Sequence, residues 1–177
     1  MQSQKSARCP AGNPLAIPLT LLYNGLIKRQ EAVLMMISTK GRYALRVMVD
    51  LAEHQGAGYL PLKEIAARQE ISEKYLETIL KILVQQGILT GVRGKGGGYR
   101  LTRPPETYTV GSILRLTEGR MAPVTCLEQP TMTCPRAAYC PTLPMWQKLD
   151  TMIQDFFDGI TIADLMANLP AGNDYVI

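Results

Sequence analysis

The fold is decided by residues 62–102, which read LKEIAARQEISEKYLETILKILVQQGILTGVRGKGGGYRLT. Apolar residues recur at helical spacing over 62–69 and again over 73–86. The second segment carries a stripe suited to burial: Leu76, Ile79, Leu80 and Leu83. Ser72 stands at the N-cap of this segment, and Gly87 follows its C-terminal end. Two short helices joined by a tight turn predict a helix-turn-helix motif.

The rest of this stretch predicts a β-hairpin. Two β-prone runs surround a glycine-rich tip, in the order 88–93, 94–98 and 99–102. Arg93, Lys95 and Arg100 give the hairpin positive charge. A basic hairpin directly after a helix-turn-helix is typical of the wing of a winged-helix domain. The glycines do not match a phosphate-binding P-loop, which needs G-x-x-x-x-G-K and then Ser or Thr, because Lys95 is followed by Gly96.

Upstream of the motif, an amphipathic helix is expected over 39–54. It opens a winged-helix domain that spans 36–104. We expect residues 1–35 to be an N-terminal extension that is either disordered or lies before the true start codon, because Met35 and Met36 are alternative starts directly before the patterned segment. The basic, semi-apolar extension faintly imitates a secretory signal, but no small-x-small cleavage site follows it.

Downstream, a second unit is expected over 105–144 and a third over 145–170. The unit over 105–144 holds a short helix, 110–118, and then a proline-rich loop with clustered cysteines.

The unit over 145–170 opens with a long helix whose apolar residues recur at spacings of three and four: Trp146, Leu149, Ile153, Phe156 and Ile160. Because this helix is remote from a small winged domain, we expect it to be a dimerisation helix rather than ordinary core. Thr161 and Asp164 resemble a capping box before a last short helix and a frayed tail.

The composition narrows the class of protein. The chain has 177 residues and is 46% hydrophobic and 19% charged, which suits a globular core and excludes global disorder. The net charge is +4, but it is unevenly distributed. Residues 36–103 hold eleven basic and six acidic residues, whereas residues 104–177 hold four basic and eight acidic ones. This division indicates that the two parts of the chain have different functions. The single histidine, His54, excludes a site built from several imidazoles, and no catalytic set points to an enzyme. No apolar run reaches the roughly 18–20 residues that span a bilayer, so we expect a cytoplasmic protein without membrane contact.

Three of the four cysteines fall within fifteen residues: Cys126, Cys134 and Cys140. An odd number of neighbouring thiols is awkward for internal disulfides. Thiolates are soft ligands, so this group suits an iron–sulfur cluster or another thiophilic metal. Three ordinary thiols in a loop is the other interpretation. The spacing alone leaves both open, because no C-x-x-C pair is present.

A winged helix-turn-helix binds duplex DNA by placing the second helix of its motif in the major groove. Lys74 suits a phosphate or a guanine edge, Glu77 a cytosine amine, and Thr78 a base edge or a thymine methyl group. Phosphate neutralisation is expected from Lys40, Arg42, Arg46, Arg93, Lys95 and Arg100. The residues we expect at the DNA are Lys40, Arg42, Ser72, Lys74, Tyr75, Glu77, Thr78, Arg93, Lys95, Gly97 and Tyr99. Operators for such domains are palindromic, so the expected partners are duplex DNA and a second copy of the chain.

Three segments resemble the Rrf-type family of bacterial transcription regulators: MISTKGRYAL at 36–45, ISEKYLE at 71–77 and VRGKGGGY at 92–99. The resemblance covers residues 36–168. It implies a homodimeric winged-helix regulator, most often a repressor, with a long C-terminal dimerisation helix. By position, it implies base reading by Lys74, Glu77 and Thr78 and minor-groove contact by Arg93. Some members carry Ser and Gln in place of Lys74 and Thr78, which implies a different preferred DNA sequence here.

The same resemblance implies that the three cysteines are ligands of an iron–sulfur cluster that senses iron–sulfur, redox or nitric oxide status. The gap between Cys126 and Cys134 is seven residues, longer than the family's usual five. Members with a cluster use a histidine at the position of Leu143, or an acid at the position of Arg42. The fourth ligand is therefore left open among His54, Asp50, Glu53, Glu128 and solvent, and the cluster type, 2Fe–2S or 4Fe–4S, is open as well. The alternative is a cluster-free regulator of the same fold, controlled by a partner protein or a small molecule.

Overall fold

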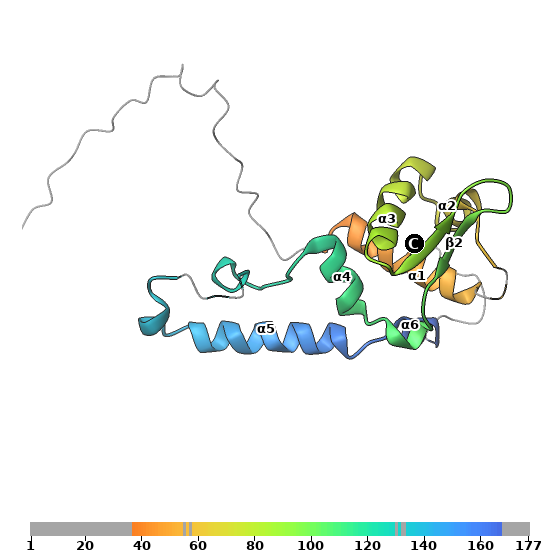
Figure 1. Ribbon diagram of the computed structural model, residues 1–177. Helices are drawn as coiled ribbons and strands as arrows, with labels where there is room; N and C mark the ends of the chain where they lie inside the picture. The colour runs from red at the N-terminus through yellow and green to blue at the C-terminus, as the bar shows by residue number, and fades with distance from the viewer. Residues whose placement is uncertain (1–36, 55, 57, 130, 132–133, 168–177) are drawn as a thin grey trace, which may run out of the picture. The chain divides into compact units, whose positions relative to one another are not determined.

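The computed structural model describes residues 37–54, 56, 58–129, 131 and 134–167, so the predictions for residues 1–35 and for the C-terminal tail lie outside the described residues. Along the chain, the elements are α1 (Thr39–Glu53), α2 (Leu62–Gln69), α3 (Glu73–Gln85), β1 (Leu89–Val92), β2 (Gly98–Leu101), η3 (Pro105–Thr107), α4 (Val110–Glu118), η4 (Thr125–Leu127), η5 (Ala137–Tyr139), α5 (Leu143–Asp158) and α6 (Ile162–Ala167) (Figure 1). The fold is mainly helical with one antiparallel hairpin, which confirms the predicted class.

Local capping explains where the helices of the motif begin and end. The Ser72 hydroxyl accepts a hydrogen bond from the Tyr75 N–H at 3.4 Å, which starts α3. Glu70 ends α2 in the left-handed region, with φ 55° and ψ 40°, and its N–H bonds back into the last turn. This sharp end turns the chain directly into α3, as the helix-turn-helix motif requires.

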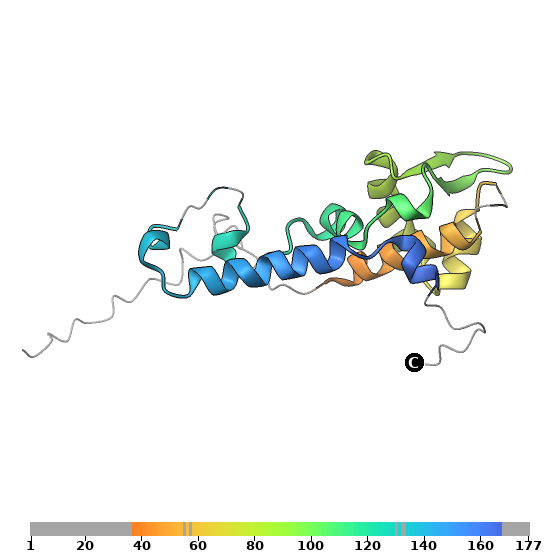
Figure 2. The ribbon, with the colours of Figure 1, turned by 90° about the horizontal axis from the view of Figure 1, so that it is seen from below.

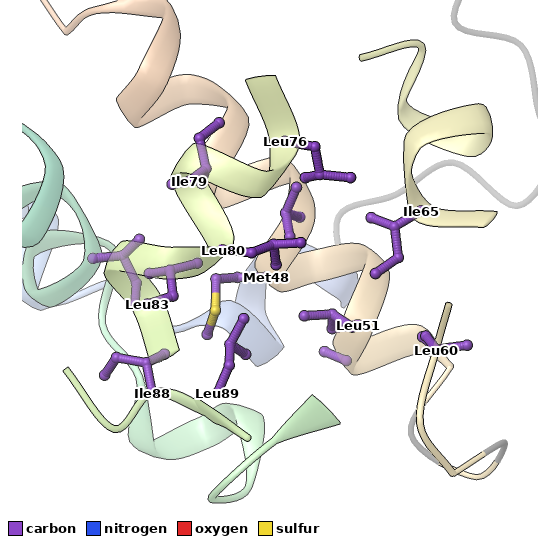
Figure 3. Packing of buried hydrophobic residues seen from close by; sticks show 14 of the residues in the cluster. Met48, Leu51, Leu60, Ile65, Leu76, Ile79, Leu80, Leu83, Ile88 and Leu89 are labelled. Carbon is purple, nitrogen blue, oxygen red and sulfur yellow. The ribbon is translucent and has the colours of Figure 1, made fainter. Parts of the chain in front are cut away.

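The core lies between α1, α3 and the start of the hairpin. Met48 of α1 and Leu80 of α3 are both fully buried, and Figure 3 shows their side chains pointing toward one another with Leu89 of β1 nearby. The predicted stripe on α3 is buried in this core: Leu76, Ile79, Leu80 and Leu83. Burial of each such side chain contributes roughly 1.5–3 kcal/mol, so the exposed face of α3 is fixed by the residues beneath it.

The wing is held at its base by backbone pairing and by one tyrosine. β1 pairs with β2 in the register that sets Leu89 opposite Leu101, and Leu60 exchanges two backbone hydrogen bonds of 2.9 Å with Tyr99. The Tyr108 side chain is fully buried; its hydroxyl accepts from the Arg103 N–H at 2.9 Å and lies 3.2 Å from the Ile88 carbonyl oxygen. The hairpin is therefore fastened to the segment that leads into α4.

After α5 the chain returns to the winged domain. The Val110 N–H donates to the Ile160 carbonyl at 2.8 Å, and the Ile162 N–H donates to the Tyr108 carbonyl at 2.9 Å. Ile162 is fully buried, so α6 belongs to the core of the winged domain. The capping box that begins α6 is confirmed, because the Thr161 N–H donates to Asp164 Oδ2 at 2.9 Å and the Asp164 N–H to Thr161 Oγ1 at 3.0 Å.

The end of α5 corrects the prediction for Ile160, which was expected on the apolar stripe of the dimerisation helix. The helix α5 ends at Asp158, so Ile160 lies beyond it and does not continue the helical stripe. Ile160 instead packs, half-buried, against a small cluster that contains Val110 and Leu114. The physical reason is a long-range backbone contact with α4, which local spacing does not reveal.

One buried carboxylate ties α1 to α2. Asp50 is 2% exposed and accepts hydrogen bonds from Arg68 Nε at 2.8 Å, Arg68 Nη2 at 2.9 Å and Gln69 Nε2 at 3.1 Å. The hydrogen bond to Asp50 raises the pKa of the Arg68 guanidinium. The same guanidinium lies 3.8 Å from Glu64, whose side chain is 58% exposed. The two acids therefore offer a matched comparison.

We expect Asp50→Ala to lower the free energy of unfolding by about 2–3 kcal/mol, because it leaves Arg68 and Gln69 without their buried acceptor. The melting temperature is expected to fall by roughly 10 °C, measured by circular dichroism. Glu64→Ala is expected to change the free energy of unfolding by less than about 0.5 kcal/mol, since an exposed ion pair contributes little. Equal effects of the two substitutions would contradict this assignment.

Candidate nucleic-acid interface and cysteine loop

The N-terminal half of α3 presents the predicted DNA-contacting side chains to solvent: Ser72, Lys74, Tyr75, Glu77 and Thr78. Tyr75 is 36% exposed, and its ring meets the edge of the Tyr43 ring with centroids 6.0 Å apart. The Thr78 hydroxyl donates to the Tyr75 carbonyl at 2.6 Å. The Thr78 methyl group is therefore the part of this side chain that is left to contact a base. The residues that face outward on α3 are thus those that the helical spacing predicts.

Basic side chains on α1, α3 and the wing have no acidic partner within the part of the chain that the structure describes. No described ion pair involves Lys40, Arg42, Lys74, Arg93, Lys95 or Arg100. Arg93 and Lys95 are exposed at the end of the hairpin, and Arg100 stacks over the Tyr59 ring at 4.8 Å. Cations that no carboxylate neutralises produce a positive field that attracts phosphates.

Arg46 has a role within the fold, and its expected phosphate contact stays a prediction. Its Nε donates to the Gln69 side chain at 3.0 Å and its Nη2 to the Gln69 carbonyl at 2.6 Å. The guanidinium also lies over the Tyr43 ring at 5.3 Å. Arg46 therefore fastens α1 to the end of α2 and supports the aromatic pair beside α3. Residues 23 positions apart along the chain make this contact, so no local pattern predicts it.

Gly97 and Tyr99 shape the wing. A Cβ atom on Gly97 would collide with the Val92 carbonyl oxygen, so the tip needs glycine for the close approach of its two strands. Tyr99 is half-buried, and its ring covers Gly91. The predicted DNA contact of both residues stays a prediction, and their backbone role is what the structure adds.

The segment 119–142, here called the cysteine loop, joins α4 to α5. Cys126 lies in the turn η4, Cys134 precedes η5, and Cys140 follows η5; all three are free and half-buried. Figure 2 shows both turns beyond the winged domain, near the N-terminal end of α5. A hydrogen bond with the Thr142 hydroxyl, 3.4 Å from the sulfur, lowers the pKa of the Cys140 thiol.

The donors of the cysteine loop fit an iron–sulfur cluster in their chemistry, because three thiols without disulfide partners lie on one segment. Within the described ranges, no group of three or more His, Cys, Asp and Glu side chains is gathered closely enough to hold a metal ion. Binding of a cluster therefore requires the three thiols to come together.

The candidate fourth ligands fall into two groups. Asp50 and Glu53 lie in the last turn of α1, and His54 is its C-cap. The Asp50 carboxylate is bound to Arg68, and His54 Nδ1 lies 2.7 Å from the Asp50 carbonyl oxygen. Glu128 lies in the cysteine loop. Its Oε1 atom is buried and has no hydrogen-bond partner among the residues that are described.

The outward face of α5 carries an exposed apolar stripe, here called the α5 stripe: Met145 (54% exposed), Leu149 (38%), Met152 (59%) and Phe156 (63%). Leu149 and Phe156 were predicted for this face, whereas the two methionines were missed although their spacing of three and four residues signals them. Trp146 and Ile153 are half-buried. Asp150 is the sole residue of α5 that is buried.

Two ion pairs hold the opposite side of α5, one to α4 and one to the residues directly after it. Arg115 binds Asp158 through both terminal nitrogens, at 2.5 and 3.1 Å, and this contact lowers the pKa of the Asp158 carboxyl. Arg120 Nη2 lies 2.6 Å from Asp150 Oδ2. These ion pairs connect α5, which follows the cysteine loop, to α4 of the winged domain and to the residues directly after α4.

No helix among the described residues is long and apolar enough to span a bilayer. A helix-turn-helix with an exposed recognition surface and a basic wing defines the class of winged-helix transcription regulators. The profile of the Rrf2 family, described as an iron-dependent transcriptional regulator, matches residues 37–168. The chain belongs to the Rrf2 family.

Individual relatives agree with this membership. The chain is 37% identical over 134 residues to the HTH-type transcriptional regulator IscR of Sodalis glossinidius, which covers 76% of this chain and 80% of that protein. The structure of CymR, the global cysteine regulator of B. subtilis, matches with a TM-score of 0.63 and 33% identity over 76% of this chain and 98% of that one. The structure of IscR from T. potens matches with a TM-score of 0.59 and 36% identity over 80% and 96%. The family model and the Sodalis relative are both described as transcriptional regulators, in agreement with the prediction of a regulator and not an enzyme.

Proposed function

We propose that the protein is a dimeric repressor that binds a palindromic operator and responds to an iron–sulfur cluster on Cys126, Cys134 and Cys140. The observation that carries the DNA-binding part is the exposed face of α3 beside a basic wing that has no acidic partner among the described residues. The proposal places the protein on chromosomal DNA, and therefore in the cytoplasm.

The contacts divide into two kinds. Lys74, Glu77 and the Thr78 methyl group read base edges in the major groove, because they are exposed on the first turns of α3. Lys40, Arg42 and the wing cations neutralise phosphates, and Arg93 reaches the minor groove. Ser72 and Tyr75 contact the DNA backbone and position the start of α3 against it. Acids in this surface serve specificity rather than affinity, since base contacts specify and phosphate contacts position.

The α5 stripe supports the dimer. A helix of 16 residues that buries a single side chain leaves its apolar residues in water, and a second copy of the same helix would cover them. A two-fold axis between two such helices sets the distance between the two copies of α3. Operator half-sites are then expected about one helical turn apart, or a multiple of that.

The cysteine loop supports control. When bound, an iron–sulfur cluster supplies redox and nitric oxide reactivity. Cys126, Cys134 and Cys140 would hold it, and gathering them would move the loop that leads into α5. Arg115 and Arg120 transmit that movement, because they bind α5 next to α4. Control requires only that the cluster binds the DNA-competent and DNA-incompetent arrangements with different affinity.

The cluster is tested by anaerobic purification of the wild type and of a triple Cys→Ala variant at positions 126, 134 and 140. We expect visible absorption, iron and acid-labile sulfide in the wild type and none in the variant, with operator affinity of the variant shifted at least about 10-fold. Gel-shift assays on the protein's own promoter measure the affinity. A wild type without iron and colour would refute the cluster, and unchanged affinity in the variant would refute control by it.

A second candidate is a regulator of the same fold that acts without a cluster, through a partner protein or a small molecule. The dispersed positions of the described metal-binding side chains favour it, together with the likeness to CymR. Iron-free wild-type protein that still binds its promoter, with unchanged affinity after the three cysteine substitutions, would establish this candidate in place of the first.

A further inference from the structure

Gln69, the last residue of α2, is held by two side chains of α1. Its Nε2 donates to the buried Asp50 carboxylate at 3.1 Å, and its Oε1 accepts from Arg46 Nε at 3.0 Å. The Gln69 carbonyl oxygen also accepts from Arg46 Nη2 at 2.6 Å. Because the amide is bound at its nitrogen and at its oxygen, its orientation is set. The Arg46 guanidinium is in turn held by two hydrogen bonds to one residue, so its plane is set as well.

The Arg46 guanidinium continues this set of contacts to α3. It lies 5.3 Å from the centroid of the Tyr43 ring, which is half-buried and packs against the core cluster. The Tyr43 ring meets the Tyr75 ring with centroids 6.0 Å apart and an interplanar angle of 78°, which is a favourable edge-to-face arrangement. The contacts therefore run from a carboxylate buried on α1, through the end of α2, to an exposed tyrosine at the start of α3.

The Tyr75 hydroxyl is available to a ligand. Tyr75 lies in the first turn of α3 and is exposed, and its hydroxyl makes no hydrogen bond to any described residue. Tyrosine hydroxyls are among the groups that donate to phosphate oxygens of DNA, and such contacts fix the register of a protein on the duplex. A side chain that is already held in one position loses less conformational freedom on binding, so its contact contributes more to affinity.

We propose that Arg46 and Tyr43 are positioning residues for DNA binding, which hold the Tyr75 ring so that its hydroxyl donates to a backbone phosphate of the operator. This inference rests on the proposed contact of Tyr75 with the DNA backbone. Gln69 and Tyr75 lie on either side of the turn between α2 and α3, so the same contacts also fix the hydroxyl relative to the helix that enters the major groove.

The test is a double-mutant cycle in operator binding, measured by fluorescence anisotropy with Arg46→Ala, Tyr75→Phe and the variant that carries both. Tyr75→Phe keeps the ring and removes the hydroxyl, and we expect it to lower affinity roughly 10-fold, since each dimer loses two hydrogen bonds to phosphate. Arg46→Ala is expected to lower affinity roughly 10-fold in the wild type but less than about 2-fold in Tyr75→Phe, because the two residues act through one contact.

Two further measurements separate positioning from charge. The slope of log affinity against log salt is expected to stay within about 0.5 of the wild type in Arg46→Ala, whereas loss of one neutralised phosphate from each protomer would make it less steep by about two. Arg46→Lys keeps the charge but not the paired contact with Gln69, so we expect it to bind as weakly as Arg46→Ala. Thermal melting checks that each variant folds, and Arg136→Ala, at an exposed position of the cysteine loop, is the matched control with unchanged affinity.

The outcomes distinguish this inference from the proposed function. A wild type that binds its operator, with independent effects of Arg46→Ala and Tyr75→Phe, would overturn the inference and leave the proposed function in place. A less steep salt slope in Arg46→Ala, with normal affinity in Arg46→Lys, would assign Arg46 to a phosphate and overturn it as well. Unchanged affinity in Tyr75→Phe would show that there is no hydroxyl contact to position. A wild type that binds no operator would refute the proposed function itself.

Discussion

The double substitution Leu149→Asp and Phe156→Asp is expected to convert the protein into a monomer and to lower its affinity for a palindromic operator at least about 100-fold. Both residues lie in the α5 stripe, where Leu149 is 38% and Phe156 63% exposed in the single chain. Two aspartates placed against their symmetry mates would bring four like charges into an apolar interface. Loss of the dimer removes the second half-site contact, which is otherwise made at high effective concentration.

Analytical ultracentrifugation measures the oligomeric state of this variant, and fluorescence anisotropy measures its operator affinity. The matched control is Gln147→Asp with Thr151→Asp, which adds the same charge to exposed positions of α5 outside the stripe. The control is expected to remain dimeric and to bind normally. A double stripe variant that stays dimeric would show that α5 does not form the interface.

Replacing both Arg93 and Lys95 with alanine is expected to lower operator affinity roughly 100-fold at physiological salt. The two side chains are exposed at the end of the wing and have no acidic partner among the described residues, so their charge is available to phosphates. A dimer loses two cations from each wing. The slope of log affinity against log salt is therefore expected to become less steep by roughly three to four.

Anisotropy titrations over a series of salt concentrations measure both quantities. Lys148→Ala with Arg136→Ala removes the same charge from exposed positions outside the winged domain, and we expect the salt slope to stay within about one of the wild type. A wing variant whose slope equals that of the wild type would show that these cations do not meet phosphates.

The local elements of this protein follow from its sequence because their causes are local. Ser72 caps α3 where the sequence predicts, and Thr109 caps α4 in the same way, since a hydroxyl at the N-cap satisfies an N–H two or three residues later. The apolar stripe of α3 predicts its buried face because helical periodicity needs no distant partner. The glycine-rich tip between two β-prone runs predicts the wing, because a hairpin turn also depends on neighbouring residues only. These local features also fix which side chains of α3 face outward.

The candidate site depended on contacts between distant residues, and there the sequence was less informative. Local spacing does not reveal that Arg46 hydrogen-bonds to Gln69, 23 residues away, and so ties α1 to the end of α2. Spacing also assigns Ile160 to the dimer seam, whereas pairing with Val110 brings it to the winged domain. Neither difference has a local signal, because each partner is brought close only by the packing of whole elements.

The cysteine loop and α5 show the division most clearly. By itself, the sequence determined the winged helix-turn-helix, its basic hairpin and the three thiols available to a soft metal, because residue type and short-range spacing are enough for each. Only the tertiary structure decided which face of α5 remains apolar and exposed, and which carboxylate oxygens are buried without a hydrogen-bond partner among the described residues. Exposure and charge compensation depend on what packs against a side chain, and for Glu128 and Phe156 those neighbours come from the folding of the whole chain.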